Sequence, residues 1–269
     1  MIYIVRFAEI GLKGKNRGMF ENTLVGNIKF PLQRKGIKAD VWRYQGRIII
    51  ECDEDISDFL KNVFGIANFS VAYESELEKV REKIFELVKS RKFETFRVTV
   101  QRLNKNFGKT SQDFAGELGA EVVKLGKNVD LKKFDLNICV EVMDKAYVFF
   151  EKVKGFGGMP VGVEGNAVCL LEDEKSAAAC WLAMKRGCSI IPVAYSDFDL
   201  SGLQLFSPHP LELVKIKNIK ETEKMAKAIV VNDTIDDIKD YDTKLLILRP
   251  LIYYEENEIN EILKLCKRK

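Results

Sequence analysis

Apolar residues recur with two different periods along the first third of the chain. Between Met19 and Gln33 they return every three or four positions, which predicts an amphipathic helix. On both sides they alternate with polar residues, which predicts strands. The predicted strands are Ile2–Ala8, Ala39–Tyr44, Arg47–Cys52 and Asn68–Tyr73, and a second helix is predicted at Ile56–Phe64. This β-α-β-β-α-β order predicts a ferredoxin-like domain over residues 1–74.

The middle of the chain has another mixture of helices and strands. Ser75 and Glu78 have the spacing of a capping box, which predicts a helix over Ser75–Lys89. Thr110-Ser111 is expected to cap a second helix that ends near Lys124. Strands are predicted at Phe93–Gln101, Asn137–Met143 and Ala146–Lys152, with a short extended piece at Val129–Leu131. The glycine-rich segment Gly155–Gly165 predicts a connector, so we expect a second domain over residues 75–165.

Strands and helices alternate again after the connector. Predicted strands are Ala167–Leu171, Ser189–Ala194, Lys227–Val231 and Lys244–Leu248, and predicted helices are Lys175–Arg186, Pro210–Ile216 and Glu256–Lys267. This alternation predicts a Rossmann-like parallel α/β domain over residues 166–269. The expected fold class is therefore a combination of α+β and α/β units.

Charge is distributed unevenly over the 269 residues. The formal net charge is +3, but residues 1–50 hold 10 Lys and Arg against 3 Asp and Glu. Residues 166–269 hold 15 basic and 17 acidic residues. A basic N-terminal face favours a polyanionic partner, although charge alone equally fits an ordinary solvated surface.

The composition also indicates a compartment. No apolar run is long enough for a membrane span, and Arg6 and Glu9 argue against a signal peptide, so no membrane association is expected. The six cysteines are scattered without a CxxC pair. We therefore expect reduced core thiols in a cytoplasmic protein, with no disulfide framework and no metal site.

Cations gather in the loop that follows the first predicted strand. Lys13, Lys15 and Arg17 are interleaved with two glycines, a composition that suits contact with a phosphate backbone. The alternative is a flexible, solvated turn.

A second group of cations surrounds an aromatic residue. Strand alternation places Arg97 on one face together with polar neighbours, and the following loop presents Arg102, Lys105 and Lys109 around Phe107. Such a group can hold single-stranded RNA by charge and stacking. The alternative for Phe107 is that it packs on the core and fixes the loop.

The segment from Ala167 to Gly187 has the order strand, turn, helix that is typical of a phosphate site. Its turn should be rich in glycine, but it consists of Glu172, Asp173, Glu174, Lys175 and Ser176. Carboxylates stabilise a helix N-terminus and repel a nucleotide. ATP binding is therefore not expected, and no cofactor is predicted.

Several motifs resemble the tRNA 4-thiouridine synthetases, which are also called tRNA sulfurtransferases. They are FAEIGLKGKNR at Phe7–Arg17, the segment from Phe96 to Ser111, Gly119-Ala120, Val129–Leu131 and GFGGMPVG at Gly155–Gly162. The resemblance is specific over residues 7–165 and looser after Leu171. It implies a ferredoxin-like domain, a THUMP domain that holds the tRNA acceptor end, and a PP-loop pyrophosphatase domain that adenylates a uridine before a cysteine persulfide delivers sulfur.

The third domain departs from the pattern of that family. Of the Ser-Gly-Gly-x-Asp-Ser loop only Ser176 matches, and Lys175 stands in place of the aspartate. No residue of the chain aligns with the family's sulfur-transfer cysteine, and no rhodanese extension is expected. The late motif Leu248-Arg-Pro-Leu-Ile252 still matches. No catalytic residue is therefore assigned.

Three hypotheses follow from these observations. The first is a tRNA-binding protein without its own ATP-dependent adenylation or sulfur transfer, whose third domain serves docking or dimerisation. The second is a subunit of a tRNA thiolation enzyme that needs a separate catalytic partner, and the third is a protein scaffold without RNA. A homodimer is expected under the resemblance, and His209, between two prolines, is expected to be structural.

Overall fold

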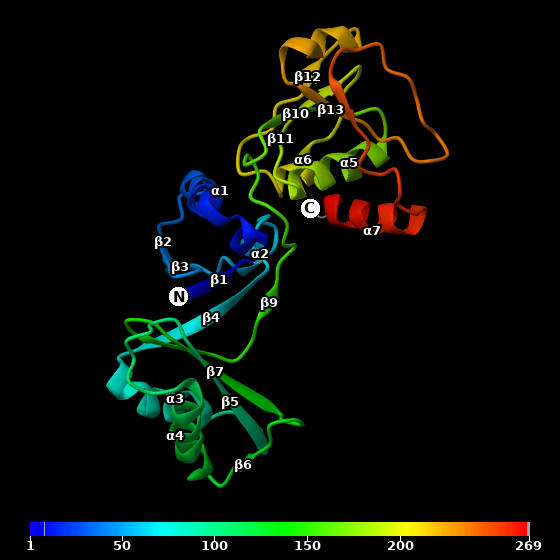
Figure 1. Cartoon of the computed structure of the whole chain (residues 1–269). Helices are drawn as coiled ribbons and strands as arrows, with labels where there is room; N and C mark the ends of the chain where they lie inside the picture. Colours follow the sequence, from blue (N-terminus) through cyan, green and yellow to red (C-terminus); the bar gives the residue numbers. More distant parts are fainter. Residues whose placement is uncertain (8, 268–269) are drawn as a thin grey trace.

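The computed structural model describes residues 1–7 and 9–267 and contains three domains (Figure 1). The N-terminal domain lies between the middle domain and the third domain, and the chain forms a crescent. The predicted combination of α+β and parallel α/β units is confirmed. Ala8, which the first predicted strand included, lies outside the described residues. Within the described ranges, no helix has the length and apolarity that crossing a membrane requires.

The N-terminal domain packs two helices on one face of an antiparallel sheet. Its strands pair in the order β2-β3-β1-β4, with Gln45 and Gly46 at positive φ in the β2–β3 turn. The apolar face of the long helix packs into a core of buried residues, because the predicted period of three to four is present. The elements are β1 (Ile2–Arg6), α1 (Arg17–Arg34), β2 (Ala39–Tyr44), β3 (Arg47–Cys52), α2 (Ser57–Lys61) and β4 (Asn68–Ser75).

The middle domain extends the same sheet. Strand β4 pairs with β1 along residues 68–72 and with β8 along residues 73–75, so one strand belongs to both domains. The sheet then continues in the order β8-β7-β5-β6, and β9 pairs with the start of β4. Its elements are α3 (Val80–Val88), β5 (Thr95–Arg102), α4 (Ser111–Val123), β6 (Asn128–Val129), β7 (Leu136–Val142), β8 (Ala146–Phe149) and β9 (Val153–Lys154).

Two arginines and one carboxylate form a buried ion cluster at the junction of these domains. Glu141 of β7 is 1% exposed and lies 2.8 Å from Arg6 of β1 and 2.8 Å from Arg47 of β3. Burial lowers the pKa of the Arg6 guanidinium, and the charge and hydrogen bonds of Glu141 act in the opposite direction. The second arginine also donates to Gln101, at the end of β5. The cluster therefore ties β1 and β3 to two strands of the middle domain.

The third domain is built on a sheet of five parallel strands in the order β12-β11-β10-β13-β14. Helices α5 and α7 lie side by side against it (Figure 1). Apolar residues of β10 are buried on both faces, because separate apolar clusters cover the two sides. The elements are β10 (Asn166–Leu170), α5 (Glu174–Lys185), β11 (Ser189–Ala194), α6 (Ser201–Gln204), β12 (Val214–Lys215), β13 (Ala228–Val230), β14 (Leu246–Leu248) and α7 (Glu256–Cys266).

Four aromatic rings join the third domain to the N-terminal domain. Trp181 of α5 has its ring 5.1 Å from Phe64, which precedes β4, and 5.3 Å from Phe156 of the connector. Phe206, after α6, stacks on Phe64 at 5.6 Å. Aromatic contacts of this kind contribute beyond the area that they bury, so the cluster fixes the third domain against its neighbour.

Two predicted helices differ from the structure because sheet pairing prevails over local signals. Ser75 pairs with Ala146 at the end of β4, so the capping box is wrong and α3 begins at Val80. Residues 210–216 do not form a helix, since Val214 pairs with Val193 in β12. The helix start predicted at Thr110 is confirmed, because its side chain accepts a hydrogen bond from the Asp113 amide.

We expect the Glu141→Ala substitution to destabilise the fold strongly. Removing the carboxylate leaves Arg6 buried without a counter-ion, a loss that typically costs about 3–5 kcal/mol. Urea denaturation followed by circular dichroism measures the effect. Glu117→Ala removes a carboxylate that pairs with Arg81 and Lys109 on the surface, and it should leave the midpoint nearly unchanged. Equal midpoints for the two variants would contradict the role of the cluster.

Candidate RNA-binding surface and phosphate-loop position

The first group of cations lies where the chain leaves β1 and enters α1. Lys13 extends over the Phe20 ring with its Nζ 4.9 Å from the centroid, and Lys15 is exposed. Arg17 donates from Nε to Glu21 at 2.7 Å and lies over the ring of Phe7. Two of these three cations are therefore held by neighbours, and Lys15 projects into solvent.

The second group lies on β5 and on the loop that follows it. Arg102 donates from Nη1 to the carbonyls of Phe107 and Lys109, so it organises the loop. The Phe107 ring is half-buried and packs edge-on against Phe114 at 4.9 Å. The ammonium of Lys109 lies 2.6 Å from Glu117. Lys105 is exposed at the turn, and no carboxylate of the described residues lies within ion-pair distance.

Arg97 lies near the start of β5. Its guanidinium is 4.2 Å from the centroid of the Phe134 ring, and its Nε donates to Asn137 of the neighbouring strand at 3.4 Å. These contacts fix the side chain on the sheet face that α3 and α4 do not cover. The charge is held in place but remains half-exposed.

The turn between β2 and β3 connects the two groups. A Cβ built on Gly46 would lie 3.0 Å from Nη2 of Arg17. The next residue, Arg47, donates to Gln101 at 3.0 Å, one position before Arg102. These contacts place the turn beside both Arg17 and the end of β5. Sequence reasoning missed Arg43 and Arg47, although both lie beside the turn of the predicted hairpin.

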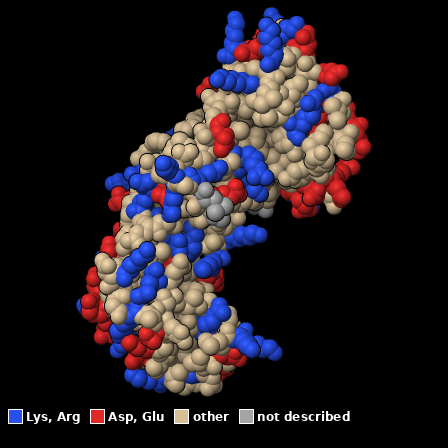
Figure 2. Space-filling model, viewed as in Figure 1, with Lys and Arg blue, Asp and Glu red and all other residues tan. Residues whose placement is uncertain are grey.

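Figure 2 shows how the charge is arranged on one face of the crescent. Lys and Arg side chains spread over the N-terminal domain and project into the hollow on its concave side. Asp and Glu side chains gather along the lower and outer edge of the third domain, with basic side chains at its far end. A basic surface of this kind is typical of proteins that bind a polyanion.

The expected phosphate loop lies at the topological switch point of the parallel sheet. From β10 the chain proceeds outward through β11 and β12, and it then returns to the other side of β10 with β13 and β14. Ligands of open α/β sheets bind at such a point, beyond the carboxyl ends of the two diverging strands. The loop Glu172–Ser176 and the residues after β13 meet there.

Side chains, not glycine amides, occupy this position. Asp173 caps α5 by accepting from the Ser176 amide at 3.1 Å, and the buried Ser176 hydroxyl accepts from the amides of Glu172 and Asp173. Asn232 of the opposite loop donates to the Asp173 carboxylate at 2.8 Å. The amides of Glu172, Asp173 and Ser176 are thus bonded within the chain.

The flanking carboxylates also have partners. Glu172 lies 3.2 Å from Lys239, and Glu174 lies 2.7 Å from Lys267. Each of the three carboxylates is thus paired with a donor of another segment. Lys175 is exposed, and no described contact holds its side chain.

The loop after β13 is held by a second buried carboxylate. Asp233 is 1% exposed and accepts from Nε of Arg249 at 2.8 Å and from the Tyr241 hydroxyl at 2.7 Å. Burial and this hydrogen bond raise the pKa of Tyr241, so its phenol remains a donor. Sequence reasoning missed the network because Asn232, which joins it to the predicted loop, is separated from Asp173 by 59 residues.

The cysteines are poorly suited to nucleophilic chemistry. Cys169 and Cys180 are fully buried in the core of the third domain. Burial raises the pKa of Cys169 and Cys188, and it raises that of Cys266 to about 12. Thiols with raised pKa values form little thiolate. Within residues 1–7 and 9–267, no three His, Cys, Asp or Glu side chains converge as metal ligands.

Comparison with known proteins identifies two of the three domains. Residues 2–70 match the model of the ThiI ferredoxin-like domain, and residues 72–151 match the model of the THUMP domain. The probable tRNA sulfurtransferase of Caldanaerobacter subterraneus subsp. tengcongensis is 37% identical over 203 residues, which are 72% of this chain and 53% of that protein. The chain spans about half the length of the curated relatives it matches.

Two solved structures match across all three domains. PH1313 from Pyrococcus horikoshii has a TM-score of 0.84 at 29% identity and covers 98% of both chains. A 4-thiouridine synthetase, solved as an RNA complex with bound ATP, has a TM-score of 0.81 at 30% identity over 99% of this chain and 84% of that one. The fold is thus that of a THUMP-domain protein with a ferredoxin-like domain before it and a parallel α/β domain after it.

The particular family follows from the relatives. The chain belongs to the family of tRNA sulfurtransferases, the 4-thiouridine synthetases.

Proposed function

We propose that this chain is a tRNA-binding protein that lacks its own ATP-dependent adenylation and sulfur transfer. The observation that carries the proposal is the contrast between two regions. The basic surface of the first two domains is open, whereas the switch point of the third domain is filled by side chains that satisfy one another. The RNA bound to the related synthetase supports tRNA as the partner.

The residues at the switch point do not fit ATP. A phosphate there would have to displace Asp173 from the amide of Ser176 and would meet the carboxylates of Glu172 and Glu174. Charge-assisted hydrogen bonds to phosphate oxygens would be lost, at about 1.5–3 kcal/mol each. We therefore assign no step of a reaction to this position.

The RNA contact is proposed for the cations that remain open. Lys15 and Lys105 are exposed, and Arg97 presents a fixed, half-exposed charge on β5. Lys13, Arg17, Arg102 and Lys109 support this surface through their internal contacts and add to its field. We expect the surface to hold the acceptor end of a tRNA, as the family resemblance implies. A cytoplasmic location is proposed on the six free cysteines.

A second candidate is a subunit of a tRNA thiolation enzyme whose catalytic groups come from a separate partner. The complete sheet order of the third domain and its fixed attachment through Trp181 favour it, because a partner would meet a defined surface. We also propose homodimerisation through the third domain, because a second copy would meet the same defined surface.

The first prediction concerns the exposed lysine of the middle domain. Lys105→Ala should weaken the binding of a tRNA transcript and reduce the slope of log K against log salt by about one, as expected for one lost phosphate contact. Lys109→Ala should have a smaller effect, because Glu117 already neutralises that ammonium. Filter binding between low and physiological salt measures both variants, and equal affinity of Lys105→Ala and wild type would remove this loop from the site.

The second prediction concerns ATP. Calorimetric titration of the purified chain with ATP and magnesium should give no binding in the micromolar range, because the amides of Glu172, Asp173 and Ser176 are bonded within the chain. Clear micromolar binding would overturn the proposed loss of the nucleotide site.

The third prediction separates the two candidate functions. Deleting the gene should leave the 4-thiouridine content of bulk tRNA unchanged if the chain only binds tRNA. Loss of 4-thiouridine, measured by nucleoside mass spectrometry, would establish the alternative of a thiolation subunit.

A further inference from the structure

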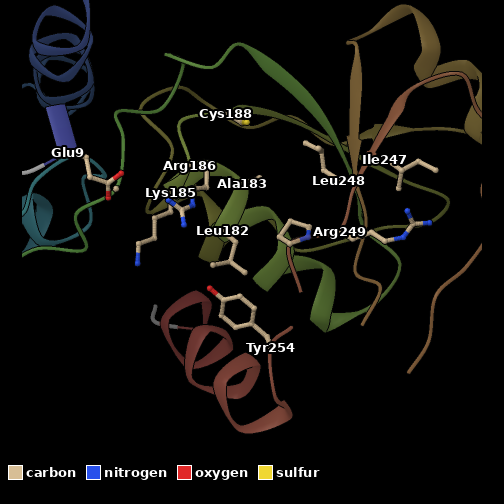
Figure 3. A pocket seen from close by; sticks show the side chains of 12 residues that line it. Glu9, Leu182, Ala183, Lys185, Arg186, Cys188, Ile247, Leu248, Arg249 and Tyr254 are labelled. Atoms are coloured by element: carbon tan, nitrogen blue, oxygen red, sulfur yellow. The ribbon is translucent and has the colours of Figure 1, made fainter. Parts of the chain in front are cut away.

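A cleft of about 650 Å³ lies between the N-terminal domain and the third domain. Glu9 and the connector residue Gly158 form one side, and the C-terminal half of α5 and the segment after β14 form the other (Figure 3). Lys185 and Arg186 lie on the side of Glu9, while Tyr254 approaches α5 from the start of α7. Arg249 also lines the cleft, but it points away from these two cations and donates to Asp233 of the loop after β13.

The two cations are not needed to complete the helix. Basic residues in a last turn usually compensate the free carbonyls of the helix end. Here the connector does so, since the amide of Met159 donates to the carbonyl of Lys185 at 3.0 Å and the amide of Gly162 donates to that of Gly187 at 2.8 Å. A Cβ on Gly158 would lie 2.3 Å from the same Lys185 carbonyl, so the connector packs directly on the helix end.

The positive charge in the cleft is poorly compensated. Lys185 lies over the Trp181 ring at 5.1 Å and is half-buried, and Arg186 is exposed. No carboxylate of the described residues lies within ion-pair distance of either side chain. Burial, Arg186 and Lys154 lower the pKa of Lys185, and Glu9 opposes them. The site therefore has an excess of positive charge that an anion would relieve.

The opposite half of the cleft is apolar. Leu182, Leu248 and Pro250 line it, and the half-exposed ring of Tyr254 stands at its edge. A volume of this size suits a ligand as large as a nucleotide. Two cations at one end and an aromatic ring at the other match the phosphate and the base of such a ligand.

We propose that this cleft binds one unstacked nucleotide of the bound RNA, with its phosphate at Lys185 and Arg186 and its base against Tyr254. The proposal rests on the proposed tRNA binding and extends the contact to the third domain. An RNA chain fits better than a free anion, because Glu9, which lines the cleft, begins the short helix Glu9–Leu12 that directly precedes Lys13 and Lys15. Glu9 itself repels the phosphate and limits the affinity.

The experiment compares four variants of the full chain for binding to a tRNA transcript over a range of salt concentrations. Arg186→Ala should weaken binding roughly fivefold and reduce the salt slope by about one. Tyr254→Ala should weaken it by a similar factor, whereas Tyr254→Phe should bind like wild type because the ring is kept. Glu9→Gln should strengthen binding, since it removes a repelling charge. Thermal melting confirms that each variant is folded.

Lys220→Ala serves as the matched charge control, because Lys220 pairs with Asp242 elsewhere on the third domain. Chemical footprinting should show nucleotides that wild type protects and that Arg186→Ala and Tyr254→Ala both expose. If wild type binds tRNA but Arg186→Ala matches Lys220→Ala in affinity and footprint, the cleft is not part of the site and the proposed function stands. If wild type does not bind tRNA, both proposals fail. Binding of ATP that Arg186→Ala abolishes would assign the cleft to a free nucleotide and overturn the inference.

Discussion

The arrangement of the basic surface depends on one buried carboxylate. Glu141 neutralises Arg6 and Arg47, which come from two strands of the N-terminal domain, while the carboxylate itself belongs to the middle domain. Ion clusters of this kind add little net stability compared with apolar packing, but a buried arginine cannot be left without its partner. The cluster therefore permits one relative position of the two domains. Because β4 pairs with both β1 and β8, the two domains cannot slide along each other. The ion cluster holds β7 of the middle domain to β1 and β3 of the N-terminal domain.

The joint to the third domain has a different physical basis. Phe64, Phe156 and Phe206 surround Trp181, so this contact is made of ring packing and not of charge. Glycines in the connector allow the backbone to lie directly on the end of α5, where a side chain would collide. The proposed cleft is a consequence of this joint, because its walls come from both domains. A change in the ring cluster would alter the cleft, because Lys185 lies over the Trp181 ring.

Periodicity in the sequence was sufficient to predict most helices and strands of the fold. Residues that alternate, or that recur every three to four positions, are governed by local geometry, and the elements around Phe20 and Thr110 agree with the prediction. The prediction failed where a distant strand competes with a local signal, as at Ser75 and Val214. Composition located the cations, but it could not show that Lys109 is paired with Glu117. It also could not show that Arg47 contacts Gln101, 54 residues away, because that depends on how the strands of the shared sheet are arranged.

The start of α5 explains how a phosphate-loop frame can persist under the proposed function. The first amides of a helix need acceptors, and either a bound phosphate or a side chain can supply them. In this chain Asp173 and Ser176 do so, and Asn232 holds the carboxylate in place. The helix then forms without a ligand. Trp181, farther along the helix, packs against Phe64 and Phe156 without a ligand as well. A protein that binds RNA without consuming ATP gains from this arrangement, because its third domain has the same position against the N-terminal domain whether or not a nucleotide is present. Asp173 and Ser176 thus give α5 a start that is capped by the chain itself.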